Sequence, residues 1–392
     1  MAGAIVSRGA SYSSGGARPL NPVRDARRFR TAIFGAILLA AACGGPTEPG
    51  LVDADLSADW PTGSPQSHAI DPTAIRNAIT HAGTLPRLLS LLVVRNGVLV
   101  VEEYFNGSFA DSLNDGRSVT KSVMSTLVGL ALHQGLLPGL TERLDTHLPP
   151  VYLNGLMAGT RAISFRDLLT MSGGFEWHET DGTLPGNTEY NAWVVSPDPV
   201  AWLLARPLVA APGTRFNYNT AGTHLMSVML TSALGKRLAD FAREELFPFL
   251  GIQRQLWEIF PDSTPNGGSG LRLRPRDFAK IGALWLQRGE TGRKTLLDPG
   301  YVDVATSSRF NLVNPPASLS GYGYGYSWWI ARTPYGDGFF AWGFGGQFIF
   351  VVPARSLVVV VTTEWRNAAG LGPQLESNGL DLIVNHVLPA VR

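Results

Sequence analysis

The chain has 392 residues, of which 45% are hydrophobic and 16% are charged. This is ordinary globular composition, and it excludes a disordered, collagen-like or coiled-coil chain. The 32 basic and 31 acidic residues nearly balance, and without the basic excess typical of nucleic-acid-binding proteins we predict no nucleic-acid partner.

The first predicted element is an export signal. Several arginines between residues 24 and 30 precede an apolar run at 31–42, which is too short to span a membrane. The small residues before Cys43 resemble a bacterial lipobox. We therefore predict a lipoprotein signal peptide at 1–42 and a lipid on Cys43 that anchors the protein in the bacterial cell envelope, facing the periplasm. The alternative is an ordinary secretory signal with an incidental cysteine.

Cys43 is the single cysteine of the chain, so we predict no disulfide and no cysteine nucleophile or zinc ligand. The following segment is rich in Gly, Pro, Asp and Ser, and we predict a flexible linker at 43–67. The remainder, 68–392, is predicted to form one domain.

Within this domain, β-rich runs at 88–94 and 98–104 flank Asn96-Gly97, which is a strong hairpin signal. Apolar residues at helical spacing then predict a long, mostly buried helix over 118–133. Residues 134–251 are mainly helical in pattern.

Strand signals return near the C-terminus, at 322–330, 348–353 and 357–363, before a terminal helix at 380–388. Strands at both ends of a helical middle predict an α+β fold whose sheet is completed by the two chain ends. We place the sheet part at about 68–115 and 255–392, and the helical part at about 116–254.

Motifs of several enzyme classes are missing. The sequence has no His-Glu-x-x-His, zinc spacing, Walker loop or Rossmann glycine signature, so we predict neither a metal nor a cofactor. The nucleophile elbow of α/β hydrolases is also missing, because the segment from Gly116 to Thr120 lacks its second glycine.

Ser118-Val119-Thr120-Lys121 lies at the start of the predicted long helix. Residues three apart share a helix face, so the lysine amine can reach the serine hydroxyl. A desolvated lysine can act as a base, and the N–H groups of a helix N-terminus can stabilise an oxyanion. The motif by itself is weak, since Ser118 could be a helix cap and Lys121 a surface residue.

Four segments carry a more specific pattern: 117–122 (Arg-Ser-Val-Thr-Lys-Ser), 163–174, 212–220 and 343–347 (Gly-Phe-Gly-Gly-Gln). In order and spacing they resemble the serine β-lactamase-related family, over about residues 70–390. That family includes class C β-lactamases, D-alanyl carboxypeptidases, lactamase-fold esterases and 6-aminohexanoate-dimer hydrolases. The resemblance implies a β-lactamase/transpeptidase-like fold, an antiparallel sheet flanked by helices with an all-helical subdomain inserted.

The resemblance also implies site residues. Ser118 would be the nucleophile, Lys121 its activating partner, and Tyr218 the tyrosine of the family's Tyr-x-Asn motif, which helps to move protons. The third position of that motif is Thr220 instead of asparagine, which argues against hydrolysis of β-lactams. Literal Tyr-x-Asn strings at Tyr104 and Tyr152 are placed wrongly for this role, and we predict that both are structural.

The family's Lys-Thr-Gly motif corresponds to Phe344-Gly345-Gly346 here, where the glycines would let substrate lie against a strand edge. The backbone N–H groups of Gln347 and Ser118 would then form an oxyanion hole. The alternative is that 343–346 is merely a turn.

Two further pocket residues are predicted. Trp177 could contact substrate, although packing explains it as well, and Ser269 could form a pocket wall or belong to a plain turn. Asp277 is predicted to start a helix and not to be catalytic.

Taken together, these features predict a serine hydrolase that cleaves a small-molecule ester or amide through an acyl-enzyme. A carboxylesterase or a 6-aminohexanoate-oligomer-like amidase is favoured over a D-alanyl-D-alanine carboxypeptidase or a β-lactamase. The competing class is a noncatalytic lipoprotein that binds cell-wall peptide. The sequence leaves the substrate and the oligomeric state open.

Overall fold

The computed structural model of the protein describes residues 54–179, 188–368 and 370–392. The predicted signal peptide, Cys43 and the first part of the predicted linker lie outside these residues. No helix in the described ranges is long and apolar enough to cross a membrane.

The predicted end of the linker, at residue 67, was wrong. Leu56 is fully buried and its N–H donates to the carbonyl of Thr291, while the indole of the buried Trp60 donates to the carbonyl of Arg276. These contacts tie residues 54–67 to the domain, so the packed domain already includes Ala54.

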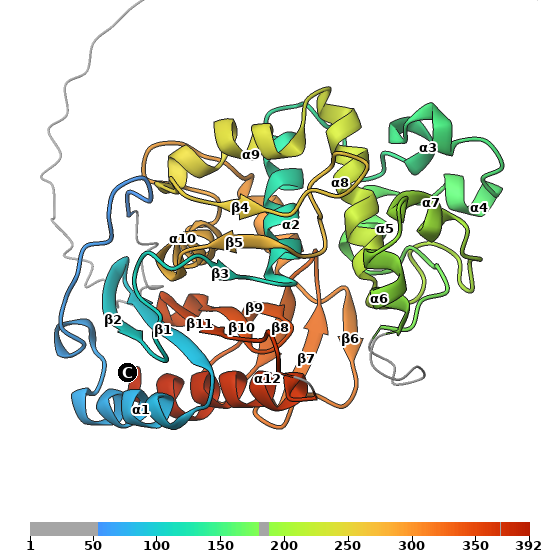
Figure 1. Cartoon of the computed structure of the whole chain (residues 1–392). Helices are drawn as coiled ribbons and strands as arrows, with labels where there is room; N and C mark the ends of the chain where they lie inside the picture. Colours follow the sequence, from blue (N-terminus) through green and yellow to red (C-terminus); the bar gives the residue numbers. More distant parts are fainter. Residues whose placement is uncertain (1–53, 180–187, 369) are drawn as a thin grey trace, which may run out of the picture. The chain divides into compact units, whose positions relative to one another are not determined.

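An eight-stranded antiparallel sheet is the centre of the domain, with strand order β2-β1-β11-β10-β9-β8-β7-β6 (Figure 1). The chain ends complete it together, since β1 pairs with β11, for example Leu92 with Val360. This confirms the predicted α+β class. The strands of this sheet are β1 (Leu88–Arg95), β2 (Val98–Tyr104), β6 (Phe310–Leu312), β7 (Gly321–Tyr324), β8 (Trp329–Arg332), β9 (Gly338–Gly343), β10 (Gln347–Val352) and β11 (Leu357–Thr363).

Two of these strands correct a prediction. The aromatic run at 322–330 is not one strand, because the chain turns at 325–328 and forms the hairpin β7–β8. Ser327 in that turn has a φ of 58°. The predicted β1–β2 hairpin is confirmed, with positive φ angles at Asn96 and Gly97.

Alternate residues of the central strands pack on opposite faces of the sheet, as the pleat requires. Val358 and Val360 face a core shared with two helices, α2 (Val119–His133) and α10 (Pro275–Leu286). Val359 and Val361 face a second core. That core is covered by α1 (Pro72–Thr84), α12 (Gly372–Asp381) and the π-helical segment η6 (Leu382–Val387) (Figure 1).

The helical part surrounds the buried helix α8 (Thr220–Leu234), which contacts α2, α3, α5, α6, α7 and α9. Its other helices are α3 (Leu144–His147), α4 (Ala158–Arg161), α5 (Phe165–Leu169), α6 (Thr188–Val194), α7 (Pro199–Leu204) and α9 (Leu238–Glu245). Helix α11 (Pro299–Ala305) belongs to the sheet part. A small second sheet has the order β3-β5-β4, formed by β3 (Asn114–Asp115), β5 (Leu271–Leu273) and β4 (Leu256–Trp257).

Helix α2 is buried on all sides, because it contacts α8 in the helical part and β9 and β10 in the large sheet. Every residue from Val119 to Ala131 is buried. Burying a charged side chain in such a helix is costly, so the lysine in its first turn points to a function.

Candidate active site

Ser118 is the N-cap of α2, and its side chain makes no capping hydrogen bond. The hydroxyl instead accepts a hydrogen bond of 2.9 Å from Lys121 Nζ. The preceding residue, Arg117, has a φ of 47°, which is unusual for a residue with a side chain. The alternative in which Ser118 only caps the helix is therefore wrong.

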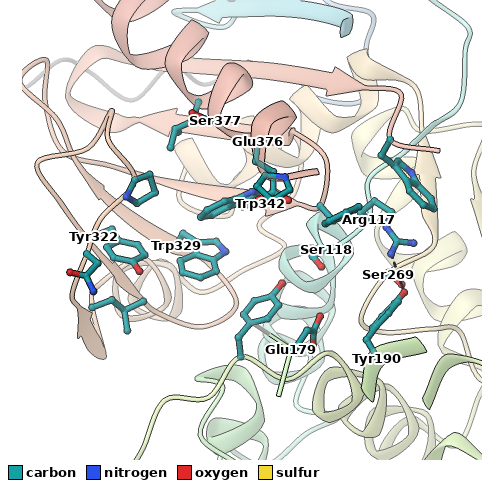
Figure 2. Close-up of a pocket in the computed structure, with 18 of the residues that line it drawn as sticks. Arg117, Ser118, Glu179, Tyr190, Ser269, Tyr322, Trp329, Trp342, Glu376 and Ser377 are labelled. Carbon is teal, nitrogen blue, oxygen red and sulfur yellow. Dashed lines mark hydrogen bonds between the residues drawn. The ribbon is translucent and has the colours of Figure 1, made fainter. Parts of the chain in front are cut away.

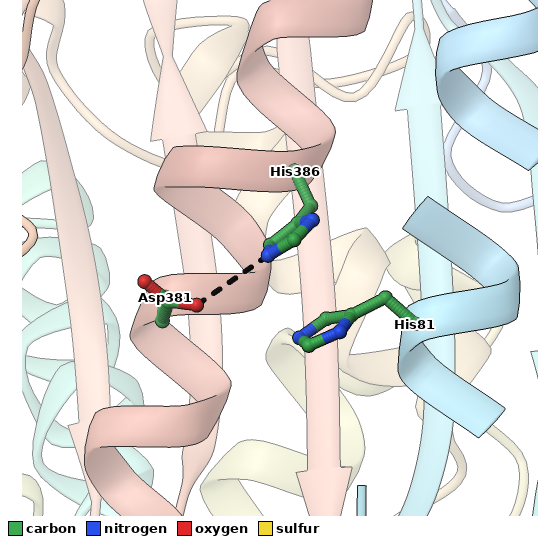
Figure 3. Close-up of side chains that lie close together, drawn as sticks. All are labelled: His81, Asp381 and His386. Carbon is green, nitrogen blue, oxygen red and sulfur yellow. Dashed lines mark ion pairs between the residues drawn. The ribbon is translucent and has the colours of Figure 1, made fainter. Parts of the chain in front are cut away.

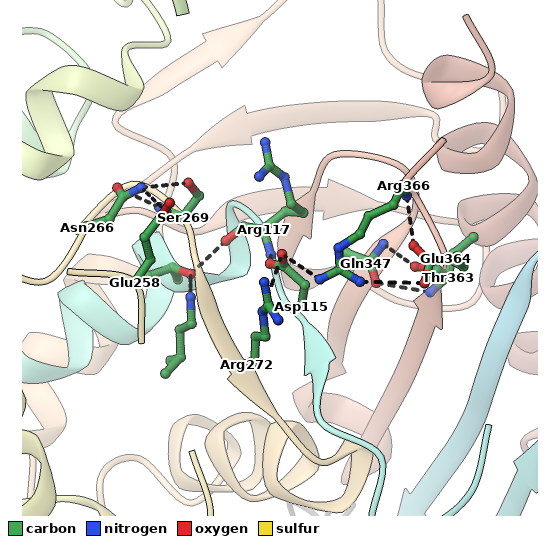
Figure 4. Close-up of polar contacts among 12 residues, drawn as sticks. Asp115, Arg117, Glu258, Asn266, Ser269, Arg272, Gln347, Thr363, Glu364 and Arg366 are labelled. Atoms are coloured by element: carbon green, nitrogen blue, oxygen red, sulfur yellow. Dashed lines mark hydrogen bonds and ion pairs between the residues drawn. The ribbon is translucent and has the colours of Figure 1, made fainter. Parts of the chain in front are cut away.

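The loop before Ser118 is held by Asp115. Its carboxylate accepts the N–H of Arg117 at 2.9 Å and lies 3.5 Å and 3.9 Å from the side chains of Arg366 and Arg272 (Figure 4). These contacts fix the strained turn that presents the Ser118 hydroxyl.

Lys121 is buried, and its amine has three acceptors. They are Ser118 Oγ at 2.9 Å, Thr220 Oγ1 at 2.9 Å and the carbonyl of Gly268 at 2.7 Å. Burial lowers the pKa of Lys121 to about 7, with Glu179 opposing and Arg117 adding to this fall. A substantial fraction is therefore neutral near pH 7 and can take a proton from Ser118. The alternative of a surface lysine is wrong.

Tyr218 precedes α8 and closes the other side of Ser118. Its ring centroid lies 4.9 Å from Lys121 Nζ, and the ring packs against Trp329 and Tyr324. Burial raises the pKa of Tyr218, while hydrogen bonding with Ser118 opposes the rise. The phenol is thus protonated at neutral pH and can donate a proton. The structure brings Ser118, Lys121 and Tyr218 together.

Thr220 has a different part in the site from the one predicted. Asn219 accepts the N–H of Gly222 at 2.8 Å and so caps α8, which turns the Thr220 side chain to Lys121. Thr220 is buried behind the lysine and does not line the cavity that contains Ser118. The predicted substrate contact is therefore corrected to a contact that holds Lys121.

Glu179 was missed by the sequence analysis. It accepts hydrogen bonds from Thr220 Oγ1 at 2.6 Å, from Thr220 N at 2.9 Å and from the indole of Trp177 at 2.8 Å. No motif marks it, because it lies on a loop far from Thr220 in sequence.

Trp177 itself is buried in the helical part, with its ring against Trp193 and Trp202. It lines a neighbouring cavity of about 360 Å³, which shares Phe216 and Tyr218 with the cavity at Ser118. The substrate contact of Trp177 stays a prediction, and in the structure its indole positions Glu179.

The loop that contains Gly268 and Ser269 lies against the start of α8. A Cβ on Gly268 would lie 2.4 Å from Thr220 Cγ2, so a side chain there would push the carbonyl away from Lys121. Ser269 lines the cavity, as predicted, and its hydroxyl accepts a hydrogen bond of 3.0 Å from Asn266 (Figure 4).

The turn between β9 and β10 lies beside the nucleophile. A Cβ on Gly343 would lie 2.2 Å from the carbonyl oxygen of Gly116, so the two backbones touch just before Ser118. The side chain of Gln347 makes two hydrogen bonds with the backbone of Thr363 (Figure 4). Gln347 Nε2 donates to the carbonyl of Thr363 at 2.9 Å, and Gln347 Oε1 accepts the N–H of Thr363 at 3.0 Å. Its side chain is therefore structural.

Within this turn only Phe344 lines the cavity, with 38% of its surface exposed. Gly345 and Gly346 have φ angles of 75° and 90°, and a Cβ on them would collide with Trp365 and Leu375 respectively. The predicted substrate contacts of these two glycines were wrong. They are needed for the turn and its packing.

The cavity has a volume of about 1090 Å³ and opens onto Ser118 and Tyr218 (Figure 2). Glu179, Glu258, Glu376 and Arg117 are the charged residues among its described lining. Its remaining aromatic lining consists of Tyr190, Phe216, Tyr322, Trp329, Trp342, Phe344 and Trp365.

One group of potential metal ligands occurs among the described residues, on the far side of the sheet from α2 (Figure 3). It consists of His81, Asp381 and His386, whose ligand atoms lie within 4.8 Å of one another. The two imidazoles are stacked with centroids 3.9 Å apart, so they would have to turn for their nitrogens to converge on an ion. The sequence did not indicate this group because its members come from opposite ends of the chain.

Comparison with known proteins gives a match to one family model by sequence and matches to many solved structures by fold. A sequence model of the family Beta-lactamase matches residues 87–376, whereas no curated protein matches. A structure from Bacillus anthracis, described as a 6-aminohexanoate-dimer hydrolase, is 18% identical with a TM-score of 0.67, covering 87% of this chain and 91% of that chain.

Two further structures have TM-scores of 0.60 and 17% identity. EstCE1, described as a hydrolase with promiscuous acyltransferase activity, covers 79% of this chain and 98% of its own. An octameric penicillin-binding protein homologue from Pyrococcus abyssi covers 81% of this chain and 77% of its own. At these identities, the likeness shows a shared fold.

Proposed function

This chain belongs to the beta-lactamase family and is a serine hydrolase, and we propose that it cleaves a small ester or amide through an acyl-enzyme on Ser118. The observation that carries the proposal is the 2.9 Å hydrogen bond between Ser118 and a buried Lys121 whose pKa is lowered to about 7. A noncatalytic binding protein would gain nothing from burying a lysine there at the cost of desolvation.

In the proposed first step, the Ser118 oxygen attacks the substrate carbonyl carbon and its proton passes to the neutral amine of Lys121. The negative oxygen of the tetrahedral intermediate accepts a hydrogen bond from the backbone N–H of Ser118 at the start of α2. Gln347 is buried where β9 and β10 pair and does not line the cavity, so its predicted place in the oxyanion hole is not kept. As the intermediate collapses, the bond to the leaving group breaks, and Lys121 with Tyr218 returns a proton to that group.

The acyl-enzyme is then hydrolysed by water. The water loses a proton to the amine and phenol pair as it attacks the ester carbonyl, and the proton returns to Ser118 Oγ when the acid is released. No redox step or external co-reactant is needed.

An ester or a linear amide is favoured over a β-lactam. Thr220 is buried behind Lys121 and replaces the asparagine that contacts the β-lactam side chain in the family. The turn at 344–346 has no lysine to bind a substrate carboxylate. The names of two similar structures, a 6-aminohexanoate-dimer hydrolase and a hydrolase with promiscuous acyltransferase activity, are in line with this choice. D-alanyl-D-alanine carboxypeptidase and β-lactamase are the alternatives.

The experiment is a substrate panel with purified protein: p-nitrophenyl butyrate, the linear 6-aminohexanoate dimer, a D-Ala-D-Ala peptide and nitrocefin. We expect turnover of the ester or the linear amide and little of the other two. Faster turnover of nitrocefin than of p-nitrophenyl butyrate would contradict the proposal, as would no turnover at all.

We also propose that the protein is exported and anchored through a lipid on Cys43, as the lipobox-like sequence before it indicates. Cys43→Ser tests this in a bacterial host fed with labelled palmitate. The parent should take up label and partition into the membrane fraction, and the variant should lose both. Equal labelling of parent and variant would contradict the proposal.

A further inference from the structure

The cavity is lined by an aromatic wall, formed by Tyr322, Trp329, Trp342 and Phe344. Figure 2 shows Tyr322 and Trp329 on the side away from Tyr190 and Ser269. These residues come from β7, β8, β9 and the turn after β9. Trp329 stacks on Tyr322 at 5.9 Å and on the reacting Tyr218 at 5.7 Å, and its ring lies 5.2 Å from Trp342. The aromatic wall is therefore continuous with the site of bond cleavage.

Glu376 of α12 lines the same cavity (Figure 2). Its Oε1 accepts the N–H of Gly345 at 3.0 Å. In the described part of the chain, no lysine, arginine or histidine forms an ion pair with it. A partly buried carboxylate without a counter-charge is costly, and here it faces a space that is large enough for a ligand.

The charged side chains of the described lining are mostly acidic. Glu179, Glu258 and Glu376 oppose one cation, Arg117. The Arg117 guanidinium donates to the hydroxyl of Tyr190 at 3.1 Å and lies 4.2 Å from the ring of Trp365. Its charge is thus stabilised by neighbouring aromatic groups, whereas the carboxylate of Glu376 has only the N–H of Gly345.

We propose that Glu376 and the aromatic wall form a subsite for an ammonium group of the substrate, with a preference for alkylated ammonium. Indole and phenol faces attract cations through their ring quadrupoles and suit a bulky, weakly hydrated trimethylammonium. The carboxylate supplies the counter-charge. This inference rests on the proposed function and narrows its substrates to esters or amides with a positive charge.

Isosteric substrate pairs provide the test, because a tert-butyl group has the shape of trimethylammonium without its charge. One pair is the p-nitrophenyl ester of γ-trimethylammoniobutyrate and its tert-butyl isostere, which places the charge on the acyl side. The other is acetylthiocholine and its tert-butyl isostere, which places it on the leaving group. In at least one pair we expect kcat/KM to favour the cation about tenfold or more.

Variants show whether this preference comes from the proposed subsite. Glu376→Gln should lower the cation-to-neutral ratio about tenfold, and Trp342→Leu should lower it about threefold, whatever happens to the absolute rates. Glu244→Gln removes an exposed carboxylate that is paired with Lys236, and it should leave the ratio unchanged.

Failure of this inference is distinct from failure of the proposed function. If the neutral esters are hydrolysed and both pairs give ratios near one, or if an anionic ester with a terminal carboxylate is the best substrate, the ammonium subsite is refuted. A ratio that is unchanged in Glu376→Gln refutes it as well.

If neither the esters nor the linear amide are hydrolysed, the proposed function fails, but the subsite is still tested by binding. Choline should quench the tryptophan fluorescence of the protein at lower concentration than its neutral tert-butyl isostere, and Glu376→Gln should remove the difference. Equal quenching by the two alcohols would refute the subsite.

Discussion

The floor of the cavity, formed by Ser118, Lys121 and Tyr218, and its wall, formed by the aromatic wall with Glu376, each contain an ionisable side chain removed from water. The two side chains differ in their hydrogen-bond partners. Lys121 in the floor has three hydrogen-bond acceptors within 2.9 Å. Glu376 in the wall has one backbone donor at 3.0 Å. Loss of water brings both pKa values to about 7, from above for the lysine and from below for the carboxyl. Lys121 has its hydrogen-bond partners without substrate, whereas Glu376 is partly protonated near pH 7, and a cationic ligand would favour its charged form.

The difference follows from the elements that form each region. The floor is built where α2, α8 and the loop with Gly268 converge, and backbone groups and side chains there are packed too closely to leave space. The wall consists of the aromatic side chains from β7, β8, β9 and the turn after β9, together with Glu376 of α12. In our proposal, the floor cleaves the bond and the wall selects the substrate.

The largest effect is expected from Ser118→Ala, which removes the nucleophile and leaves the wall intact. Ester hydrolysis should fall at least about 10³-fold, because no other group can form the acyl-enzyme. Choline should still quench fluorescence as it does in the parent. Retention of parental turnover by the variant would show that the floor is not the catalytic region.

Lys121→Met removes the base while keeping a long apolar side chain in the buried position. Acylation should slow about 10³-fold, since Ser118 then has no group to take its proton. The melting temperature should stay unchanged or rise, because a buried amine is costly to desolvate and a thioether is not. An unfolded variant, or a folded one with parental activity, would contradict the account of Lys121.

The pH dependence separates the two ionisable groups. Only the neutral amine of Lys121 can accept a proton, and its pKa is lowered from 10.5 to about 7. For a neutral ester, kcat/KM should therefore rise about tenfold per pH unit below 7 and level off above it. The same acid limb should persist in Glu376→Gln. A rate that keeps rising to pH 9 would show that the lysine has its ordinary pKa.

A smaller change is expected from Glu179→Gln. The negative charge of Glu179 favours the protonated lysine and so raises its pKa. The variant should shift the acid limb of the kcat/KM profile to lower pH. Weaker hydrogen bonds to Thr220 should lower the plateau of kcat/KM about tenfold. A merely structural glutamate would lower the plateau without moving the limb. Glu244→Gln, as the matched control, should move neither.

The floor could be predicted from the sequence better than the wall for a physical reason. Ser118 and Lys121 are three residues apart on one helix, so their contact is local, and Tyr218 precedes a helix start that Asn219 marks. Glu179 reaches the floor from a distant loop by tertiary packing alone, which no local pattern encodes. For the same reason Glu376 was not predicted.

The fold shows the same division between local and distant information. The hairpin at Asn96-Gly97 and the long helix α2 were predicted because turn residues and helical spacing are local signals. The predicted end of the linker was wrong, because the burial of Leu56 and Trp60 depends on contacts with distant residues. The predicted strand at 322–330 was wrong as well, because the turn at Ser327 depends on such contacts too. Gly345 and Gly346 were assigned to substrate, but they pack inside the protein and support the residues that line the cavity.

The central claim is that Ser118, activated by Lys121, is the nucleophile, and covalent labelling with a fluorophosphonate tests it most directly. After incubation of the purified protein, mass spectrometry of its peptides should find one adduct, on Ser118, whose rate of formation rises up to about pH 7 and is greatly reduced in Lys121→Met. An adduct on another residue, or equal labelling of Ser118→Ala and the parent protein, would contradict it.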